Sequence, residues 1–113
     1  AYMAPEQAQG KADTAGPACD VYALGAILYE CLTGCPPFRA NTVLETLRRV
    51  ISDEPRPPRD VRPDVPPDLE AVCLRCLQKE PADRFPTAAA LAAALGDWLD
   101  GRDSRVWLPS RAG

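Results

Sequence analysis

The chain has 113 residues, with 13 Lys and Arg against 16 Asp and Glu, which gives a formal net charge of −3. This length allows one domain at most, and a mildly acidic chain lacks the basic surface that is typical of nucleic-acid-binding proteins. Histidine is absent, which excludes Ser-His-Asp and Cys-His catalysis and every metal site that needs imidazole.

The first predicted helix spans residues 18–32 and follows a loop at residues 10–17 that contains Gly and Pro at its ends. Apolar residues cover nearly its whole circumference, and only Asp20 and Glu30 carry charge. A helix of this kind is buried rather than amphipathic. Gly34 predicts its end, because glycine readily adopts the left-handed conformation of a helix cap.

A second helix is predicted to begin with the capping box at residues 42–45 and to end near Ser52. Its apolar stripe consists of Leu44, Leu47, Val50 and Ile51. Residues 55–67 then hold six of the 13 prolines, so we expect this segment to be extended or turning and not helical. A flexible linker between two domains is the alternative. An ordered loop across one domain is favoured, because too few residues flank it for two independent cores.

A third helix is predicted to begin near Pro67, since proline is favoured in the first turn, and to end near Lys79. Its apolar face consists of Leu69, Val72, Cys73, Cys76 and Leu77. Thr87 caps the fourth predicted helix, whose apolar stripe consists of Leu91, Leu95, Trp98 and Leu99. No alternating strand pattern is present. The sequence therefore predicts an all-α fold, with residues 101–113 as a C-terminal tail or the start of a linker.

Five cysteines occur in a chain without a visible signal peptide, so we expect reduced thiols and a cytoplasmic location. Two cysteine pairs, Cys31 with Cys35 and Cys73 with Cys76, would complete a tetrahedral zinc site. However, Cys31, Cys73 and Cys76 lie on apolar helix faces, where a reduced cysteine behaves as a small hydrophobic residue. Packing in the core is favoured over zinc, and we expect no metal-ligating residue.

Three charged residues lie in apolar surroundings. Asp20 and Glu30 have simple structural interpretations, namely a contact with the helix dipole worth about 1 kcal/mol and an exposed helix edge. Arg84 lies in a short proline-bounded turn beside an aromatic residue, which indicates a partner carboxylate elsewhere. Deleting one member of such a pair, if it is buried, costs about 3–5 kcal/mol. No neighbouring residue identifies the acid.

Four motifs occur in order: YMAPEQ at residues 2–7, DVYALG at 20–25, TGCPPF at 33–38 and CLQKEPADRF at 76–85. With the predicted helices between them, they resemble the C-terminal lobe of a eukaryotic-type Ser/Thr protein kinase. The sequence of these motifs is similar to that of bacterial multi-domain kinases, particularly the planctomycete type. Tyr22 stands where the family usually has Trp.

The resemblance implies roles for six residues. Glu6 would pair with Arg84 and tie the activation segment to the last helical region, and Asp20 would hydrogen-bond the backbone of the catalytic loop. Three residues are candidates for contact with the protein substrate: Tyr2, Met3 and Glu30. The first two would line the pocket for the residue after the phosphoacceptor, and the third would contact a basic side chain.

Phosphoryl transfer in this family needs a Gly-rich loop, a catalytic Asp and a metal-binding Asp, and no G-x-G-x-x-G, His-Arg-Asp or Asp-Phe-Gly motif occurs in this chain. We therefore expect no catalytic residue here. Residues 1–100 would form a partial kinase domain, inactive alone, that provides the substrate platform and structural base.

A longer parent protein would bind ATP and Mg²⁺ through its other part. The expected partners are the rest of the kinase domain, including the N-lobe and catalytic loop, and a protein substrate, with no nucleic acid and no membrane segment in this chain. Whether the parent is membrane-anchored is left open. The alternative is a stand-alone helical interaction module derived from a kinase, similar to a pseudokinase.

Overall fold

The computed structural model describes residues 3–10 and 16–101. Every regular element in these residues is helical, which confirms the all-α prediction. The elements are α1 (Pro5–Ala8), α2 (Pro17–Thr33), α3 (Val43–Ser52), α4 (Pro58–Val61), α5 (Pro67–Cys76), the 3₁₀ turn η1 (Pro81–Asp83) and α6 (Ala88–Leu99). None of these helices is long and apolar enough to cross a membrane.

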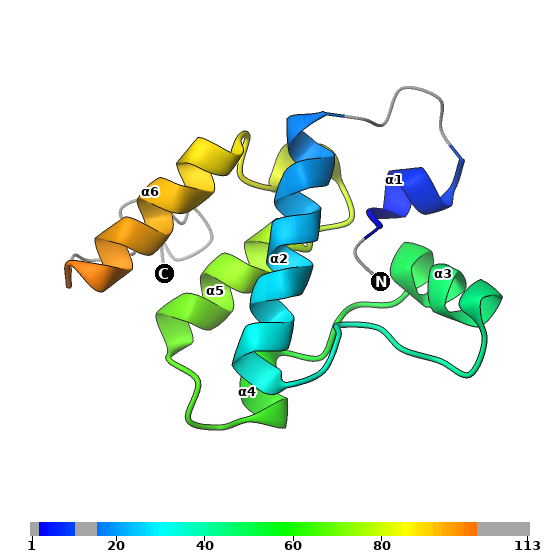
Figure 1. The fold of residues 1–113 in the computed structure, drawn as a ribbon, viewed down its shortest axis with the longest axis horizontal. Coiled ribbons are helices and arrows are strands. Elements are labelled where there is room, and N and C mark those ends of the chain that lie inside the picture. Colours follow the sequence, from blue (N-terminus) through cyan, green and yellow to red (C-terminus); the bar gives the residue numbers. More distant parts are fainter. Residues whose placement is uncertain (1–2, 11–15, 102–113) are drawn as a thin grey trace.

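Helix α2 is the central element, with α1 and α3 on one side of it and α5 and α6 on the other (Figure 1). It begins at Pro17. Proline is favoured at the first helical position because an N–H there would have no hydrogen-bond partner within the helix. It ends at Gly34, which adopts a left-handed φ of 84° and donates its N–H to Glu30 O at 2.8 Å. The predicted helix and its glycine cap are confirmed.

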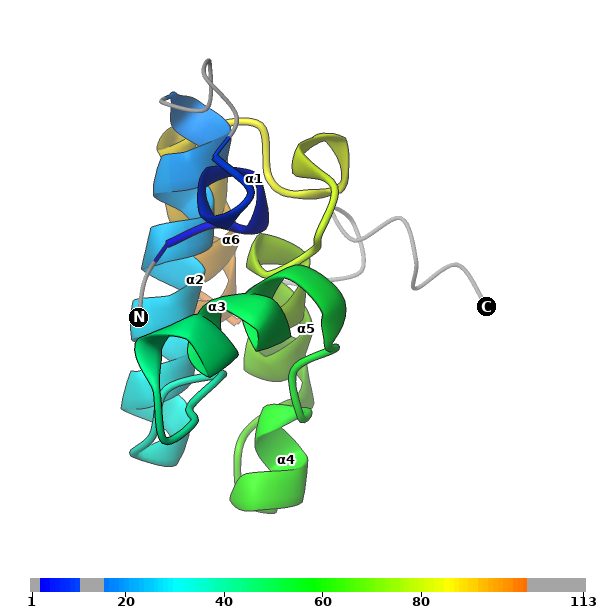
Figure 2. The same ribbon diagram turned by 90° about the vertical axis from the view of Figure 1, so that its right-hand side faces the viewer.

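The side chains of α2 divide between two apolar clusters. Tyr22, Ala26 and Tyr29 belong to a cluster that also takes residues from α3 and α5, whereas Val21 packs with residues of α5 and α6. Helices α1 and α3 lie side by side (Figure 2). Where α2 and α5 meet, a Cβ at Gly25 would collide with Cβ of Cys76, so the close approach of the two helices depends on glycine.

The proline-rich segment at residues 55–67 corrects one prediction and confirms another. It contains the single-turn helix α4, which begins at Pro58, because a proline at the first helical position loses no hydrogen bond. The segment is ordered and packs on the domain, since Pro58 is buried and the Tyr29 hydroxyl donates to Arg56 O at 2.9 Å. The ordered-loop interpretation is confirmed.

Several apolar residues lie outside the core, against prediction. Leu44 is 78% exposed and Leu99 is 76% exposed, because each lies where no described helix covers its face. Helix α2 is also not buried all round: Leu24 is 40% exposed and Ile27 is 43% exposed. Helix α5 ends at Cys76 rather than near Lys79. Most of the predicted loop at residues 10–17 and nearly all of the predicted tail lie outside the described residues.

Candidate functional site

Glu6 lies in the first turn of α1. Ala4 is extended, Pro5 takes the first helical position, and Gln7 Oε1 accepts a hydrogen bond from the Ala4 N–H at 3.1 Å, so local residues close this turn. The side chain of Glu6 is only 10% exposed. An ionised carboxylate with so little access to water needs a partner.

Arg84 is that partner, and it reaches Glu6 from the segment that follows η1. Its side chain is fully buried, and each of the five N–H donors of a guanidinium has an acceptor. Nη1 and Nη2 donate to Oε2 and Oε1 of Glu6, both at 2.8 Å. Backbone carbonyls accept the other three bonds: Ala18 O at 3.0 Å, Lys79 O at 3.1 Å and Gln78 O at 2.8 Å.

This network joins three parts of the chain that are far apart in sequence, namely α1, the start of α2 and the turn that contains η1. Bidentate hydrogen bonds between charged groups are among the strongest in proteins. The hydrogen bonds from Arg84 lower the pKa of Glu6 to about 2, although burial alone would raise it. The structure thus brings together two of the six residues to which the resemblance assigned roles.

Two further residues surround this pair. Cys19 Sγ donates to Glu6 Oε2 at 3.3 Å, and burial, together with this bond, raises the pKa of the thiol to about 11. The Tyr22 ring centroid lies 5.0 Å from the guanidinium carbon of Arg84, within reach of a cation–π interaction. Sequence reasoning missed the contact of Cys19, because a cysteine on a buried helix face is indistinguishable from an ordinary core residue.

Asp20 and Glu30 both lie on α2 but not near each other. Asp20 is exposed in the first turn, and Glu30 is half-buried near the other end. Ten residues of α-helix place them about 15 Å apart along the axis. They therefore do not form one cluster and are two separate polar positions on the same helix.

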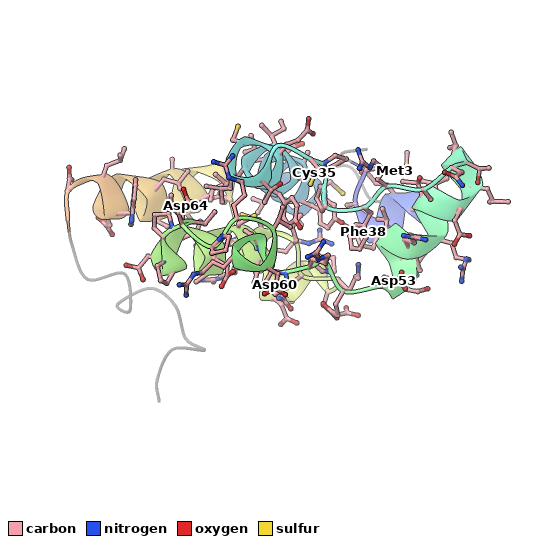
Figure 3. The ribbon with its side chains drawn as sticks, turned by 90° about the horizontal axis from the view of Figure 1, so that it is seen from below. Met3, Cys35, Phe38, Asp53, Asp60 and Asp64 are labelled. Atoms are coloured by element: carbon pink, nitrogen blue, oxygen red, sulfur yellow. The ribbon has the colours of Figure 1, made fainter. Side chains whose placement is uncertain are left out.

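Met3 is 44% exposed. It lies at the end of the molecule that contains α1 and α3, opposite α6 (Figure 3). Tyr2, the other residue expected beside the phosphoacceptor, lies outside the described residues.

The cysteines divide into two environments. Cys73 and Cys76 are fully buried, and burial raises the pKa of both thiols, that of Cys76 to about 12. Their predicted core packing is confirmed. For Cys31 that prediction is wrong, because it is exposed on α2. Among residues 3–10 and 16–101, no group of His, Cys, Asp or Glu is arranged to hold a metal ion.

An apolar groove runs between α2 and α6. It has a volume of about 280 Å³, and its wall on α2 includes Leu24, Ile27 and Cys31. On α6 it is lined by Leu91 and Leu95 together with the small side chains of alanines. A continuous apolar surface of this kind is a feature of protein–protein contacts.

A model of the protein kinase domain matches residues 1–95. The chain is 46% identical over 98 residues to "Tyrosine-protein kinase MasK" of Myxococcus xanthus, covering 87% of this chain and 15% of that protein. It is 43% identical over 94 residues to "Serine/threonine-protein kinase PknB" of Mycolicibacterium smegmatis, covering 83% of this chain and 15% of that protein. It thus spans about a seventh of the length of these relatives.

A solved structure extends the comparison to three dimensions. The autoinhibited serine kinase domain of the giant muscle protein titin superimposes with a TM-score of 0.72 at 28% identity, over 88% of this chain and 29% of that chain. The planctomycete type stays a prediction, since the relatives named here come from other bacteria. The chain belongs to the protein kinase family, and its helices are a portion of the C-terminal lobe of that domain.

Proposed function

We propose that this chain is the substrate-binding and structural base of a protein kinase that transfers phosphate from ATP to Ser or Thr of a protein. The observation that carries the proposal is the buried Glu6–Arg84 pair. It fixes α1, which begins two residues after Met3, against the start of α2 and the turn that contains η1. ATP and Mg²⁺ bind to residues of the kinase outside this chain.

Asp20 has a positioning role in this proposal. Its carboxylate is exposed in the first turn of α2, where it accepts hydrogen bonds from the backbone of the catalytic loop in the complete domain. Glu30 contacts a basic side chain of the substrate. Asp20→Asn is expected to lower kcat in the full-length protein, whereas Glu30→Gln raises KM for substrates with a basic residue before the phosphoacceptor.

The matched control is Asp64→Asn, because the side chain of Asp64 is 80% exposed and lies far from α2's first turn in sequence. Phosphorylation of a basic test peptide with radiolabelled ATP measures all three variants. Equal kcat for Asp20→Asn and Asp64→Asn would contradict the role of Asp20. Failure of the unmodified full-length protein to transfer phosphate would favour the interaction-module alternative.

The groove between α2 and α6 is where we propose that the rest of the kinase domain packs. The groove is lined by apolar side chains, and two of them, Leu24 and Ile27, are more than a third exposed in this chain. An apolar element from the rest of the domain would cover them. The 113-residue chain alone is therefore expected to bind a hydrophobic dye and to self-associate. A cooperative, monomeric unfolding transition without dye binding would contradict this.

Variants of the groove make the test specific. Leu24→Gln with Ile27→Gln is expected to reduce dye binding by the isolated chain but to destabilise the full-length protein. Leu44→Gln removes an equally apolar side chain that is 78% exposed on α3 and outside the groove. If Leu44→Gln reduces dye binding as much as the groove variant, the dye is reporting general exposure and not this surface.

A further inference from the structure

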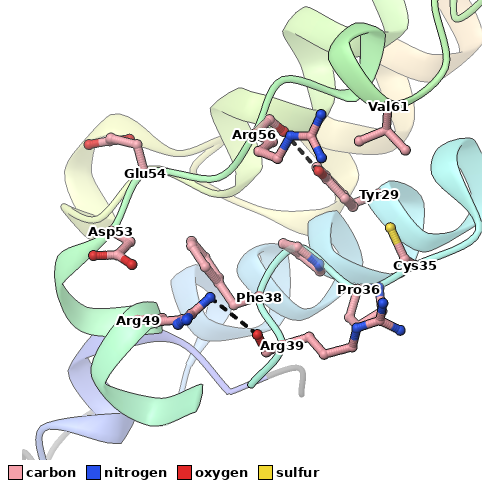
Figure 4. A pocket seen from close by; sticks show the side chains of 11 residues that line it. Tyr29, Cys35, Pro36, Phe38, Arg39, Arg49, Asp53, Glu54, Arg56 and Val61 are labelled. Carbon is pink, nitrogen blue, oxygen red and sulfur yellow. Dashed lines mark hydrogen bonds between the residues drawn. The ribbon is translucent and has the colours of Figure 1, made fainter. Parts of the chain in front are cut away.

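A second pocket lies between the loop that follows α2, the C-terminal end of α3 and the extended segment that leads to α4 (Figure 4). It has a volume of about 390 Å³, within the range of pockets that bind ligands. Its lining includes the aromatic rings of Tyr29 and Phe38, both of which are mostly buried. This Tyr29–Phe38 pocket contains none of the six residues to which the kinase resemblance assigned roles.

Hydrogen bonds hold the walls of the pocket in place. The Tyr29 hydroxyl donates to Arg56 O at 2.9 Å, and Arg49 Nη1 donates to Arg39 O at 3.4 Å. Lys79 covers the Phe38 ring, with Nζ 4.4 Å from the ring centroid. The pocket is therefore formed before any ligand arrives, which lowers the entropic cost of binding.

The charges around the pocket are separated. Asp53 and Glu54 lie at one end, and the guanidinium groups of Arg39 and Arg56 lie toward the other (Figure 4). Arg49 has a carboxylate partner, with Nε 3.6 Å from Glu45 Oε1. In the part of the chain that the structure describes, neither Arg39 nor Arg56 forms an ion pair.

We propose that the Tyr29–Phe38 pocket binds a short acidic peptide segment of a partner protein. An apolar side chain of that segment packs on Tyr29 and Phe38, and its carboxylates pair with Arg39 and Arg56. Arginine suits this role because its planar guanidinium binds a carboxylate through two hydrogen bonds. An inorganic anion would use the arginines but not the aromatic floor, so the combination favours a peptide. Binding here does not depend on phosphoryl transfer.

The test uses two fluorescein-labelled peptides and fluorescence polarisation with the full-length protein. One peptide has a Leu-Pro centre flanked by glutamates, and the other has the same centre flanked by glutamines. The glutamate peptide is expected to bind about tenfold more tightly, which corresponds to about 1.4 kcal/mol, and its binding weakens as salt is raised. Equal binding of the two peptides, or no saturable binding of either, would overturn the proposal.

Charge variants locate the site. Arg39→Glu and Arg56→Glu are each expected to weaken binding of the glutamate peptide by about tenfold or more, whereas Asp53→Asn strengthens it by removing repulsion. Arg62→Glu makes the same charge change at an exposed arginine outside the pocket and leaves binding unchanged. The four substituted side chains are exposed, so we expect the variants to fold normally. Thermal denaturation of each variant checks this. A loss with Arg62→Glu equal to that with Arg39→Glu would show non-specific attraction and overturn the assignment.

Discussion

Replacing Arg84 by Ala tests the energetics of the buried ion pair. The substitution removes five hydrogen bonds at once, two of them to the Glu6 carboxylate. It also leaves Glu6, whose side chain is 10% exposed, without a positive partner. Cys19 then remains as a donor to that carboxylate, but a single thiol compensates only weakly for a guanidinium.

The expected magnitude follows from burial. Breaking a buried ion pair by removing one partner costs about 3–5 kcal/mol, because an uncompensated charge stays in the interior. For a domain of the size of a complete kinase domain, 1 kcal/mol lowers Tm by about 2–4 °C. Arg84→Ala is therefore expected to lower the Tm of the complete domain by about 6 °C or more and to reduce the folded fraction at physiological temperature.

Urea denaturation of the complete kinase domain measures this effect, and the chain itself offers a matched control. Arg48 and Glu45 are 2.6 Å apart, as close as Arg84 and Glu6, but their side chains are 69% and 36% exposed. Arg48→Ala is expected to leave the denaturation midpoint nearly unchanged, since exposed ion pairs contribute little. The contrast isolates burial as the cause.

A double-mutant cycle provides the refutation. Glu6→Ala removes the carboxylate that Arg84→Ala leaves unpaired, so the double variant is expected to lose about 1–3 kcal/mol less than the sum of the single losses. Additive losses would show that the two side chains act independently. A change in unfolding free energy within about 0.5 kcal/mol for Arg84→Ala, the size typical of a surface substitution, would refute the reasoning directly.

Three other predictions concern pH, packing and thiol reactivity. The folded pKa of Glu6, about 2, lies below its usual value of 4.5, so ionised Glu6 stabilises the folded state by about 3 kcal/mol. This stabilisation is fully present above pH 4.5 and is lost as the pH falls towards 2. Urea midpoints measured across this range should fall accordingly, and Glu6→Gln should remove the part of the pH dependence that comes from Glu6. Gly25→Ala is expected to destabilise the domain by about 1–3 kcal/mol or more, because its Cβ would collide with Cys76 on α5. A Cβ at Gly96 meets no atom within 4 Å, so Gly96→Ala should stabilise α6 by about 0.5–1 kcal/mol. Similar shifts in melting temperature for the two variants would contradict the close packing of α2 on α5. In iodoacetamide labelling followed by mass spectrometry, with the isolated chain diluted until it is monomeric, exposed Cys31 should react before buried Cys73. Simultaneous labelling of the two would show that the α2–α5 core is open.

The long helices could be predicted from local sequence signals. Helix α2 has its proline start and glycine end, and α6 has the Thr87 cap, whose hydroxyl accepts from the Ala90 N–H at 3.0 Å. These signals act within one or two turns, so the sequence contains them completely. The short helix α4 could not be predicted in the same way, because prolines that exclude a helix interior also favour a helix start.

Contacts between distant segments were harder to predict. The Pro-bounded turn indicated that Arg84 needs an acid, but Glu6 is 78 positions away, and only the family resemblance suggested that residue. Exposure also depends on which other helices pack nearby, and the spacing of apolar residues within one helix does not reveal this. The spacing therefore predicts Leu44, Leu99 and Cys31 in the core, although they are exposed. The Tyr29–Phe38 pocket has no sequence signature, since its walls come from three separated segments.

Phosphate transfer to a protein substrate tests the central claim most directly. The full-length protein and the 113-residue chain are each incubated with radiolabelled ATP, Mg²⁺ and myelin basic protein, and the labelled product is hydrolysed to identify the phosphorylated amino acid. We predict phosphoserine or phosphothreonine with the full-length protein and no transfer by the chain alone. Transfer by the chain alone, or phosphotyrosine as the only product of the full-length protein, would contradict the account.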